Sequence, residues 1–384
     1  MAGVKPALPP DRFRGGRLIS IYPMKTKLPL VAAGVLTLAS FSAGPARADQ
    51  KTKTLDVYWV DSEGGGSTLI VTPAGESILI DTGNPGGRDP SRIVAAAKDA
   101  GLTKIDHVII THWHTDHFGG AAEVAQALPF GALYHRAIPD GDPDGRKQST
   151  FPTQIKPFRE IAAKRAELVR AGTQVPLLNA GGTPKLGLRC LAADQKFVEP
   201  TAAQAKAKNP LTGSVPAKAA DTSDNANSAV WLLEFGAFRL FDGGDLTWNI
   251  EEQLVTPVNL AGVVDVYQTN HHGLGVSNNP LLVQSLEPTV VVMNNGPQKG
   301  GEAGTFAAIK STKSVQATYQ LHESFKSPAD NVAAEFIANR GNLVGAEAAK
   351  CPANVIKMTV AADGKSYTLS VPSTGHTRTY KTKG

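Results

Sequence analysis

The sequence has no repeat of fixed period, and beyond its N-terminal region it has no apolar run long enough to cross a membrane. With 41% hydrophobic and 19% charged residues, it also lacks the composition of a disordered or collagen-like chain. These absences leave a folded globular protein. Its 384 residues allow two or three ordinary domains, but α/β enzymes of this length often form a single unit.

Most of the chain also lacks an excess of charge. The formal net charge is +5, but residues 1–48 hold seven of the 39 basic residues and one of the 34 acidic ones. Residues 49–384 therefore carry 32 basic and 33 acidic residues, and outside residues 201–220 they contain no basic run with interleaved aromatic side chains. Nucleic acid is an allowed partner but not the favoured one, and a small molecule or a component of the cell envelope is expected instead.

The first 48 residues end in the pattern of a secretory signal peptide. Two lysines follow Met24, a short apolar run comes next, and small residues precede Asp49, where we expect the mature chain to begin. The run is shorter than the roughly 20 residues that span a bilayer. We therefore expect a periplasmic or secreted protein that is not inserted in a membrane after the signal is removed.

Both cysteines, Cys190 and Cys351, lie in the part expected to be exported. An oxidising compartment permits a disulfide between them. Sequence spacing does not decide pairing, so one disulfide and two separate thiols are equally open.

Strand and helix signals alternate along residues 49–384, which we expect to form a single domain with a Lys- and Ala-rich surface insertion near 201–220. Strands are predicted at 55–60, 68–71, 77–80, 106–110, 229–235, 238–241, 263–269, 289–293, 314–319, 355–360, 366–371 and 376–380. Helices are predicted at 89–100, 118–127, 157–170, 277–286 and 302–310. Two βα-rich halves, each opening with antiparallel strands, indicate an α/β fold with an αββα sandwich.

Four candidate metal ligands fall within six positions directly after the predicted strand 106–110: His112, His114, Asp116 and His117. Imidazole and carboxylate are groups that zinc favours, and they also accept iron or manganese. The segment lies in a strand-to-helix loop, where functional groups are commonly displayed. It therefore predicts half of a metal site, to be completed by residues from distant loops.

The His-x-His-x-Asp-His pattern resembles the signature of the metallo-β-lactamase superfamily. Residues 78–83 around Asp81 resemble the family's early motif, in which the aspartate supports the metal loop without binding metal. Residues 241–245 resemble the strand that ends in a metal-bridging aspartate, here Asp245, and residues 270–273 resemble the late histidine motif. The resemblance covers about residues 55–325 and implies the four-layer αββα fold of that superfamily.

Within the superfamily, the His-His-Gly motif and Asn227-Ser228 resemble the branch that contains the hydrolase domain of the competence DNA-uptake protein and the phosphorylcholine esterases. As in that branch, no histidine stands at the usual third-motif place, and we expect His135 beside the pocket rather than on the metal. The glycine turn at 63–67 lacks the aspartate of the competence-type pattern, which argues against close equivalence with nuclease-like members.

The resemblance implies two metal ions, zinc in the first place. The implied ligands are His112, His114, Asp116, His117, Asp245 and one of His271 and His272. The site of His112 and His114 is left open or weakly filled. Adjacent side chains leave a strand end in different directions, so spacing does not choose between His271 and His272. We prefer His272 as the ligand, with His271 donating to the substrate or acting as general acid.

Three further residues are candidates for substrate binding. Asn294 and Lys299 lie in a polar loop after the predicted strand 289–293, where either side chain can meet an anionic group. His322 follows the predicted strand 314–319 and either reaches the same pocket or lies on the surface.

The expected reaction is hydrolysis by a metal-bridging hydroxide, with Asp116 and His271 as the catalytic side chains. A phosphodiester is the leading substrate. A β-lactam, lactone or other ester is the alternative, although the missing third histidine argues against a β-lactam. A non-catalytic metal-binding module is the remaining reading, and the intact set of ligands argues against it. The oligomeric state is open.

Overall fold

The computed structural model describes residues 52–163 and 165–384. The expected signal peptide and its cleavage site lie outside these residues. The described chain contains two nine-stranded sheets. None of its helices is both long and apolar enough to pass through a membrane.

The first sheet has the strand order β18-β17-β16-β1-β2-β3-β4-β5-β6. Neighbouring strands are antiparallel from β18 to β3 and parallel from β3 to β6. Its strands are β1 (Leu55–Trp59), β2 (Thr68–Val71), β3 (Ser77–Ile80), β4 (Ile105–Ile110), β5 (Phe130–His135), β6 (Ala166–Leu168), β16 (Ile356–Val360), β17 (Ser366–Val371) and β18 (His376–Lys381).

The second sheet has the order β15-β14-β13-β12-β11-β10-β8-β7, with β9 paired to β8. It is antiparallel from β7 to β11 and parallel from β11 to β15. Its strands are β7 (Gln174–Val175), β8 (Leu186–Ala193), β9 (Lys196–Phe197), β10 (Val230–Phe235), β11 (Phe238–Asp242), β12 (Val266–Gln268), β13 (Val290–Met293), β14 (Ala317–His322) and β15 (Ile337–Asn339).

The two sheets pack face to face around one apolar cluster that draws side chains from both, among them the fully buried Trp59 of β1 and Trp231 of β10. Trp59 Nε1 and Thr68 Oγ1 each donate a hydrogen bond of 2.7 Å to Gln268 Oε1, which joins the first sheet to β12 of the second. Burial of apolar area between the sheets is the main stabilising contribution.

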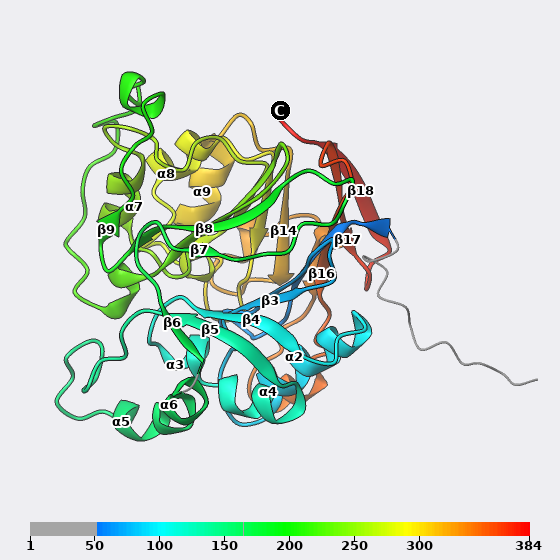
Figure 1. The fold of residues 1–384 in the computed structure, drawn as a ribbon. Coiled ribbons are helices and arrows are strands. Elements are labelled where there is room, and N and C mark those ends of the chain that lie inside the picture. Colours follow the sequence, from blue (N-terminus) through cyan, green and yellow to red (C-terminus); the bar gives the residue numbers. More distant parts are fainter. Residues whose placement is uncertain (1–51, 164) are drawn as a thin grey trace, which may run out of the picture. The chain divides into compact units, whose positions relative to one another are not determined.

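Helices cover the two outer faces (Figure 1). The first sheet carries α2 (Arg88–Asp99), α4 (Ala121–Ala127), α5 (Phe151–Gln154) and α6 (Lys156–Ala162), and the second carries α7 (Trp248–Val255), α8 (Pro280–Leu286) and α9 (Ala303–Ser311). In α2 the buried Ile93, Ala96 and Ala97 follow the spacing of one helical face. The four-layer αββα prediction is therefore confirmed.

Several element boundaries differ from the prediction. The helix expected over 157–170 ends at Ala162, and Ala166–Leu168 instead forms β6 on the open edge of β5. The strand expected at 314–319 is β14, three residues later at each end. Strand β8 and helix α7 were not predicted, and residues 201–220 contain one short 3-10 turn, Gln204–Lys206, among the elements described.

The two cysteines are free thiols in the described chain. Cys190 Sγ donates to Ala192 O at 3.1 Å within the core, whereas Cys351 Sγ donates to Asp61 Oδ2 at 3.2 Å. Burial raises the pKa of each thiol to about 12. The disulfide that the sequence left open is not formed.

Candidate metal centre

The candidate site lies where the loops after the carboxyl ends of β3, β4, β11 and β12 meet. In each sheet the strands concerned are parallel neighbours, β3 with β4 and β11 with β12. Parallel neighbours present their carboxyl ends at the same edge, which is where ligands bind in α/β folds. The topology thus brings the first half of the chain against the second half at one place.

Residues 111–117, which follow β4 and contain the four candidate ligands of the sequence motif, are called the metal loop. Asp81, directly after β3, holds this loop in place. Its Oδ1 accepts the backbone N–H of Thr111 at 2.8 Å, and its Oδ2 accepts the Thr111 hydroxyl at 2.7 Å. The same Oδ2 lies 2.7 Å from His117 Nδ1. This contact turns His117 Nε2 toward the centre, as a carboxylate behind a metal-binding histidine does, and agrees with the supporting role expected for Asp81.

The glycine turn between β1 and β2 is in close contact with the metal loop. A Cβ atom on Gly66 would lie 2.7 Å from both Asp81 Oδ2 and His117 Nδ1, and one on Gly65 would lie 2.7 Å from Asp116 O. Gly66 N donates to Asp116 O at 3.0 Å. No larger residue fits there, so these glycines serve the close approach of backbone to metal loop.

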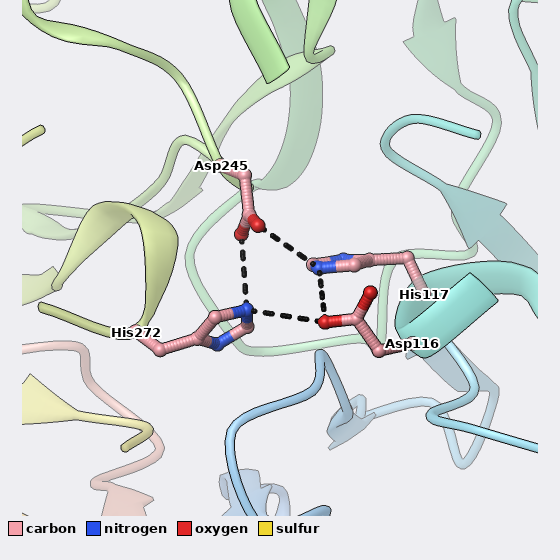
Figure 2. Close-up of side chains that lie close together, drawn as sticks. All are labelled: Asp116, His117, Asp245 and His272. Carbon is pink, nitrogen blue, oxygen red and sulfur yellow. Dashed lines mark ion pairs between the residues drawn. The ribbon is translucent and has the colours of Figure 1, made fainter. Parts of the chain in front are cut away.

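Four side chains from three separate segments converge on one point: Asp116, His117, Asp245 and His272 (Figure 2). One ligand atom from each lies within 4.8 Å of the others. His117 Nε2 is 3.3 Å from Asp245 Oδ2 and 3.6 Å from Asp116 Oδ2, and His272 Nε2 is 3.3 Å from Asp245 Oδ1 and 3.6 Å from Asp116 Oδ2.

These distances fit a metal ion. Zinc bonds of about 2.0–2.1 Å place tetrahedral donor atoms about 3.3 Å apart. Within the described residues His117 Nε2, His272 Nε2 and Asp245 Oδ1 are buried without a hydrogen-bond partner. Buried polar atoms are normally satisfied, so the convergence of these three fits the binding of a cation. Imidazole and carboxylate donors suit zinc, and also iron or manganese.

His112 and His114 lie beside this cluster. His112 Nε2 is 3.1 Å from His114 Nδ1 and 3.8 Å from Asp245 Oδ2. The opposite ring nitrogens have outer partners: His112 Nδ1 lies 3.1 Å from Thr111 Oγ1, and His114 Nε2 lies 2.9 Å from Asp144 Oδ1. Such outer contacts orient metal-binding imidazoles, so these two rings have the outer partners that metal ligands would have.

His271 and His272 both turn toward Asp245, in a 3-10 turn rather than at the end of an extended strand. His271 has φ 52° and His272 has φ 56°, both in the left-handed region. His271 Nε2 lies 3.5 Å from Asp245 Oδ2, whereas His272 Nε2 approaches Oδ1. The geometry therefore places His272 in the four-residue cluster, as we preferred, but it also brings His271 to the shared carboxylate.

The charges of the centre are strongly coupled. Burial opposes ionisation of Asp116 and Asp245, but the facing His117 outweighs burial and holds the pKa of both carboxyl groups well below the usual range. Burial likewise opposes a charge on His117, yet Asp245, Asp81 and Asp116 raise its pKa well above the ordinary value. Burial lowers the pKa of His112 well below normal and that of His271 to about 4. The centre thus combines ionised carboxylates, a protonated His117 and the neutral imidazoles of His112 and His271. Ionised carboxylate and neutral imidazole are the forms that bind metal, so metal binding would displace the proton of His117.

Lys299 reaches the centre from the loop after β13 and forms an ion pair with Asp116 Oδ2. Burial opposes its charge, but Asp116 and Asp245 raise the pKa of Lys299 above normal, so the ammonium stays protonated. Its side chain is 40% exposed, which leaves it accessible to a ligand. Asn294 of the same loop is buried, and its Oδ1 accepts the Thr269 hydroxyl at 3.4 Å.

His322 does not join the cluster. It is fully buried at the end of β14, and its Nε2 lies 2.7 Å from Asp61 Oδ1. Asp61 also receives Cys351 Sγ, and Arg92 Nη1 lies 3.0 Å from Asp61 Oδ2. Because the guanidinium already balances this carboxylate, the group ties β1 to β14, and the expectation that His322 binds substrate is not met.

Two clefts flank the centre. One, of about 510 Å³, is lined by His114 and Asp116 together with Asp144, Arg146 and Phe151. The other, of about 570 Å³, is lined by His271 together with Asn225, Lys218, Trp248 and Val276. The first cleft thus contains two candidate ligands and Arg146, and the second contains His271 and Lys218.

Sequence reasoning missed several residues that position the site. Asp144 lies in a polar loop with three aspartates, and no spacing rule marks it as the partner of His114. Asn225, whose Nδ2 is 3.5 Å from His271 Nε2, precedes the Asn-Ser pair of the resemblance. The one available signal was the glycine after His271-His272, since Gly273 continues the left-handed turn with φ 85°.

Parts of the chain are similar in sequence to known proteins. Residues 61–184 match the sequence model of the Metallo-beta-lactamase superfamily. Thioesterase pkgB of Emericella nidulans is 32% identical over 97 residues, 25% of this chain and 28% of that protein. Competence protein ComA of Neisseria gonorrhoeae is 24% identical over 262 residues, 68% of this chain and 30% of that protein. The matches thus span less than a third of either relative's length.

Among solved structures, the metallo-beta-lactamase fold protein YhfI from Bacillus subtilis aligns with a TM-score of 0.40 and 12% identity, over 70% of this chain and 96% of that one. The match to the family model begins at Asp61 and runs through Asp81 and the four ligands of the metal loop. Over residues 61–184 the chain therefore resembles the metallo-β-lactamase superfamily in sequence, and its two-sheet fold agrees with the αββα sandwich that this resemblance implies.

Proposed function

We propose that the protein is a metal-dependent hydrolase with two divalent ions, zinc in the first place. The observation that carries this proposal is the convergence of three buried atoms without a hydrogen-bond partner, His117 Nε2, His272 Nε2 and Asp245 Oδ1. Each of the two nitrogens lies 3.3 Å from an oxygen of the Asp245 carboxylate. Divalent ions held there lower the pKa of water toward 7 and stabilise negative charge on oxygen. Three or four protein ligands per ion leave room for water, as in catalytic zinc sites.

The chain's own residues divide the remaining work. Asp116 has its carboxylate between His117 and His272 and in contact with Lys299, so it links the cluster to the cleft. Lys299 offers a protonated amine to an anionic oxygen of the substrate. Asp81 keeps the His117 ring oriented and does not face the substrate.

A phosphodiester is the substrate class we favour. It keeps one negative charge, which the Lys299 ammonium can meet. It also carries two ester substituents, and two separate clefts adjoin the centre and can receive them. Lys218 lines the second cleft and favours an anionic group there, whereas Arg146 of the first cleft is already paired with Asp142 and Asp144. The near-neutral charge of residues 49–384 argues for a small molecule or an envelope component rather than a long nucleic acid.

Hydrolysis of a carboxylic ester or thioester is the second candidate. It is supported by the sequence match of 97 residues to Thioesterase pkgB. The same metal chemistry attacks a carbonyl carbon, and a fold does not fix its substrate. A neutral ester has no negative charge for the Lys299 ammonium to bind. We therefore rank ester and thioester hydrolysis below phosphodiester hydrolysis.

We also propose that the protein works outside the cytoplasm, in the periplasm or after secretion. The support is the signal-peptide pattern that ends before Asp49. Free Cys190 and Cys351 do not oppose this location, because neither thiol is placed to pair with the other.

A parallel screen tests the proposed activity. The zinc-loaded protein is assayed with bis-p-nitrophenyl phosphate, p-nitrophenylphosphorylcholine, single-stranded DNA, a chromogenic cephalosporin, an acyl lactone and an acyl thioester. We expect turnover of the phosphodiesters that stops with a chelator. If only the cephalosporin, the lactone and the thioester were hydrolysed, the phosphodiester assignment would be wrong. If the zinc-, manganese- and iron-loaded proteins hydrolysed none of the substrates, the proposal of a hydrolase would be wrong.

A further inference from the structure

The two histidines of the His-His-Gly turn approach opposite oxygens of one carboxylate. His272 Nε2 is 3.3 Å from Asp245 Oδ1, and His271 Nε2 is 3.5 Å from Asp245 Oδ2. Adjacent side chains of an extended strand point to opposite faces, so this pairing requires another backbone. The consecutive left-handed conformations of His271, His272 and Gly273 supply it. Such strained backbone, which non-glycine residues rarely adopt, is concentrated at functional sites.

We propose that His271 is a metal ligand, and that it completes the site of His112 and His114 across the shared Asp245. The His-His-Gly turn would then give one histidine to each ion. This inference rests on the proposed metal centre and extends it, because it fills the site that the sequence left without a third histidine. It also replaces the role of general acid that we first expected for His271.

The distances around Asp245 Oδ2 support this assignment. His112 Nε2 lies 3.8 Å and His271 Nε2 3.5 Å from that oxygen, and His112 Nε2 lies 3.1 Å from His114 Nδ1. These values bracket the separation of about 3.3 Å expected between donors on a tetrahedral zinc ion. The donor atoms of His112 and His271 thus approach the same oxygen of Asp245.

The surroundings of the His271 ring also suit a ligand. Its Nδ1 lies 3.3 Å from Ser277 Oγ, so a proton on Nδ1 can be donated outward while Nε2 keeps its lone pair toward Asp245. His112 and His114 have the same arrangement, with Thr111 and Asp144 behind them. The backbone N–H of His271 donates to Gly244 O at 3.0 Å, which fixes the turn against the loop of Asp245.

The rival third ligand is His135, the one other histidine between His117 and Asp245 in the sequence. Its ring packs against Trp113 and Phe158, with centroids 5.3 Å and 5.4 Å away, and its Nδ1 lies 2.6 Å from Arg136 O. These contacts hold it in an apolar pocket behind the metal loop. His135 therefore serves as the matched control for His271.

The test measures metal binding by the full chain, without reference to turnover. Apo protein is titrated with Co²⁺, and bound metal is counted after dialysis against buffered zinc. His271→Asn removes the imidazole but keeps a residue that tolerates positive φ. Loss of an orienting partner alone weakens metal binding about 10–100-fold, so we expect His271→Asn to weaken one of two ions at least tenfold and to change the Co²⁺ absorption of that site.

Two comparison variants sharpen the result. His135→Asn is expected to bind both ions as the wild type does, and His272→Asn is expected to weaken the ion that His271→Asn leaves in place. Two ions bound with unchanged affinity and absorption by His271→Asn would overturn the inference, as would loss of the second ion in His135→Asn alone. A wild type that binds two ions but hydrolyses nothing would refute the proposed function while leaving His271 a ligand.

If a folded His271→Asn protein cannot be obtained, the wild type still decides the matter. The imidazole nitrogen resonances of His271 in ¹⁵N-labelled protein should shift when the second equivalent of zinc is added. An unshifted His271 at full occupancy would overturn the inference.

Discussion

His117 Nδ1 lies 2.7 Å from Asp81 Oδ2, and the same carboxylate receives both the backbone N–H and the hydroxyl of Thr111. One buried aspartate thus fixes the start of the metal loop and the orientation of a ligand six residues further on. Asp81 has φ 63°, a left-handed conformation that directs its side chain back over β4. The geometry of the candidate metal site therefore depends on Asp81, which is not itself a candidate ligand.

Asp81→Asn should therefore weaken metal binding without removing a ligand. An amide in place of the carboxylate disturbs either the Thr111 contacts or the His117 contact, and loss of such an orienting partner weakens affinity about 10–100-fold. Competition with a chromophoric zinc chelator measures the effect. Asp99→Asn, on the exposed end of α2, is the control and should bind zinc as the wild type does.

Gly66→Ala tests the close contact between the glycine turn and the metal loop. The new methyl group would lie 2.7 Å from Asp81 Oδ2 and His117 Nδ1, so we expect loss of bound metal and a lower melting temperature. Gly304→Ala is the control, because a Cβ there meets no atom within 4 Å and lies in α9, where alanine is favourable. Normal metal content in Gly66→Ala would contradict the described packing.

Asp116→Ala should reduce hydrolysis by more than about a hundredfold, because it removes a metal ligand and the anchor of Lys299. Far-ultraviolet circular dichroism should show that the fold is kept, since Asp116 lies at the surface of the cleft rather than in an apolar cluster. Wild-type rates in this variant would exclude the centre as the place of reaction.

Lys299→Met tests recognition of an anionic substrate. Loss of a charge-assisted contact costs roughly tenfold or more, so KM for a phosphodiester should rise at least about tenfold while neutral esters are little affected. Lys98→Met, on α2, is the matched control and should leave both substrates unchanged. An equal loss on charged and neutral substrates would mean that Lys299 acts through Asp116 and not on the substrate.

The stability of the metal-free protein should depend on pH because of the buried Asp242. Burial and the charge of Asp81 raise the pKa of Asp242 to about 7, against the opposing hydrogen bond from Gly244 N. The folded state therefore keeps a proton that the unfolded chain loses, and the stabilisation present at low pH is lost as pH rises through 7. Chemical denaturation should show that wild type loses stability relative to Asp242→Asn between about pH 5 and pH 8; an equal difference at both values would refute it.

The metal loop and the sandwich could be read from sequence because their signals are local. Three short strands with turn residues between them, and four ligands in six positions, are patterns of neighbouring residues. The hairpin of β10 and β11 and the three closing strands were also found, with boundaries close to those observed.

The remaining features depend on contacts between distant residues. Strand β6 exists because β5 offers an open edge, which Ala166–Leu168 cannot signal by itself. The pairing of His114 with Asp144, 30 residues away, and of His322 with Asp61, 261 residues away, has no sequence pattern. The orientation of the His271 side chain depends on a left-handed turn at residues 270–273, where the sequence predicted only the end of a strand.

The most direct test of the account is the metal content of the purified protein. After expression in metal-supplemented medium and removal of loosely bound ions, elemental analysis should find one to two equivalents of zinc, manganese or iron per chain, and His117→Ala should lose at least one of them. A wild-type protein without bound metal, which also fails to take up zinc at micromolar concentration, would contradict the metal centre and the function proposed for it.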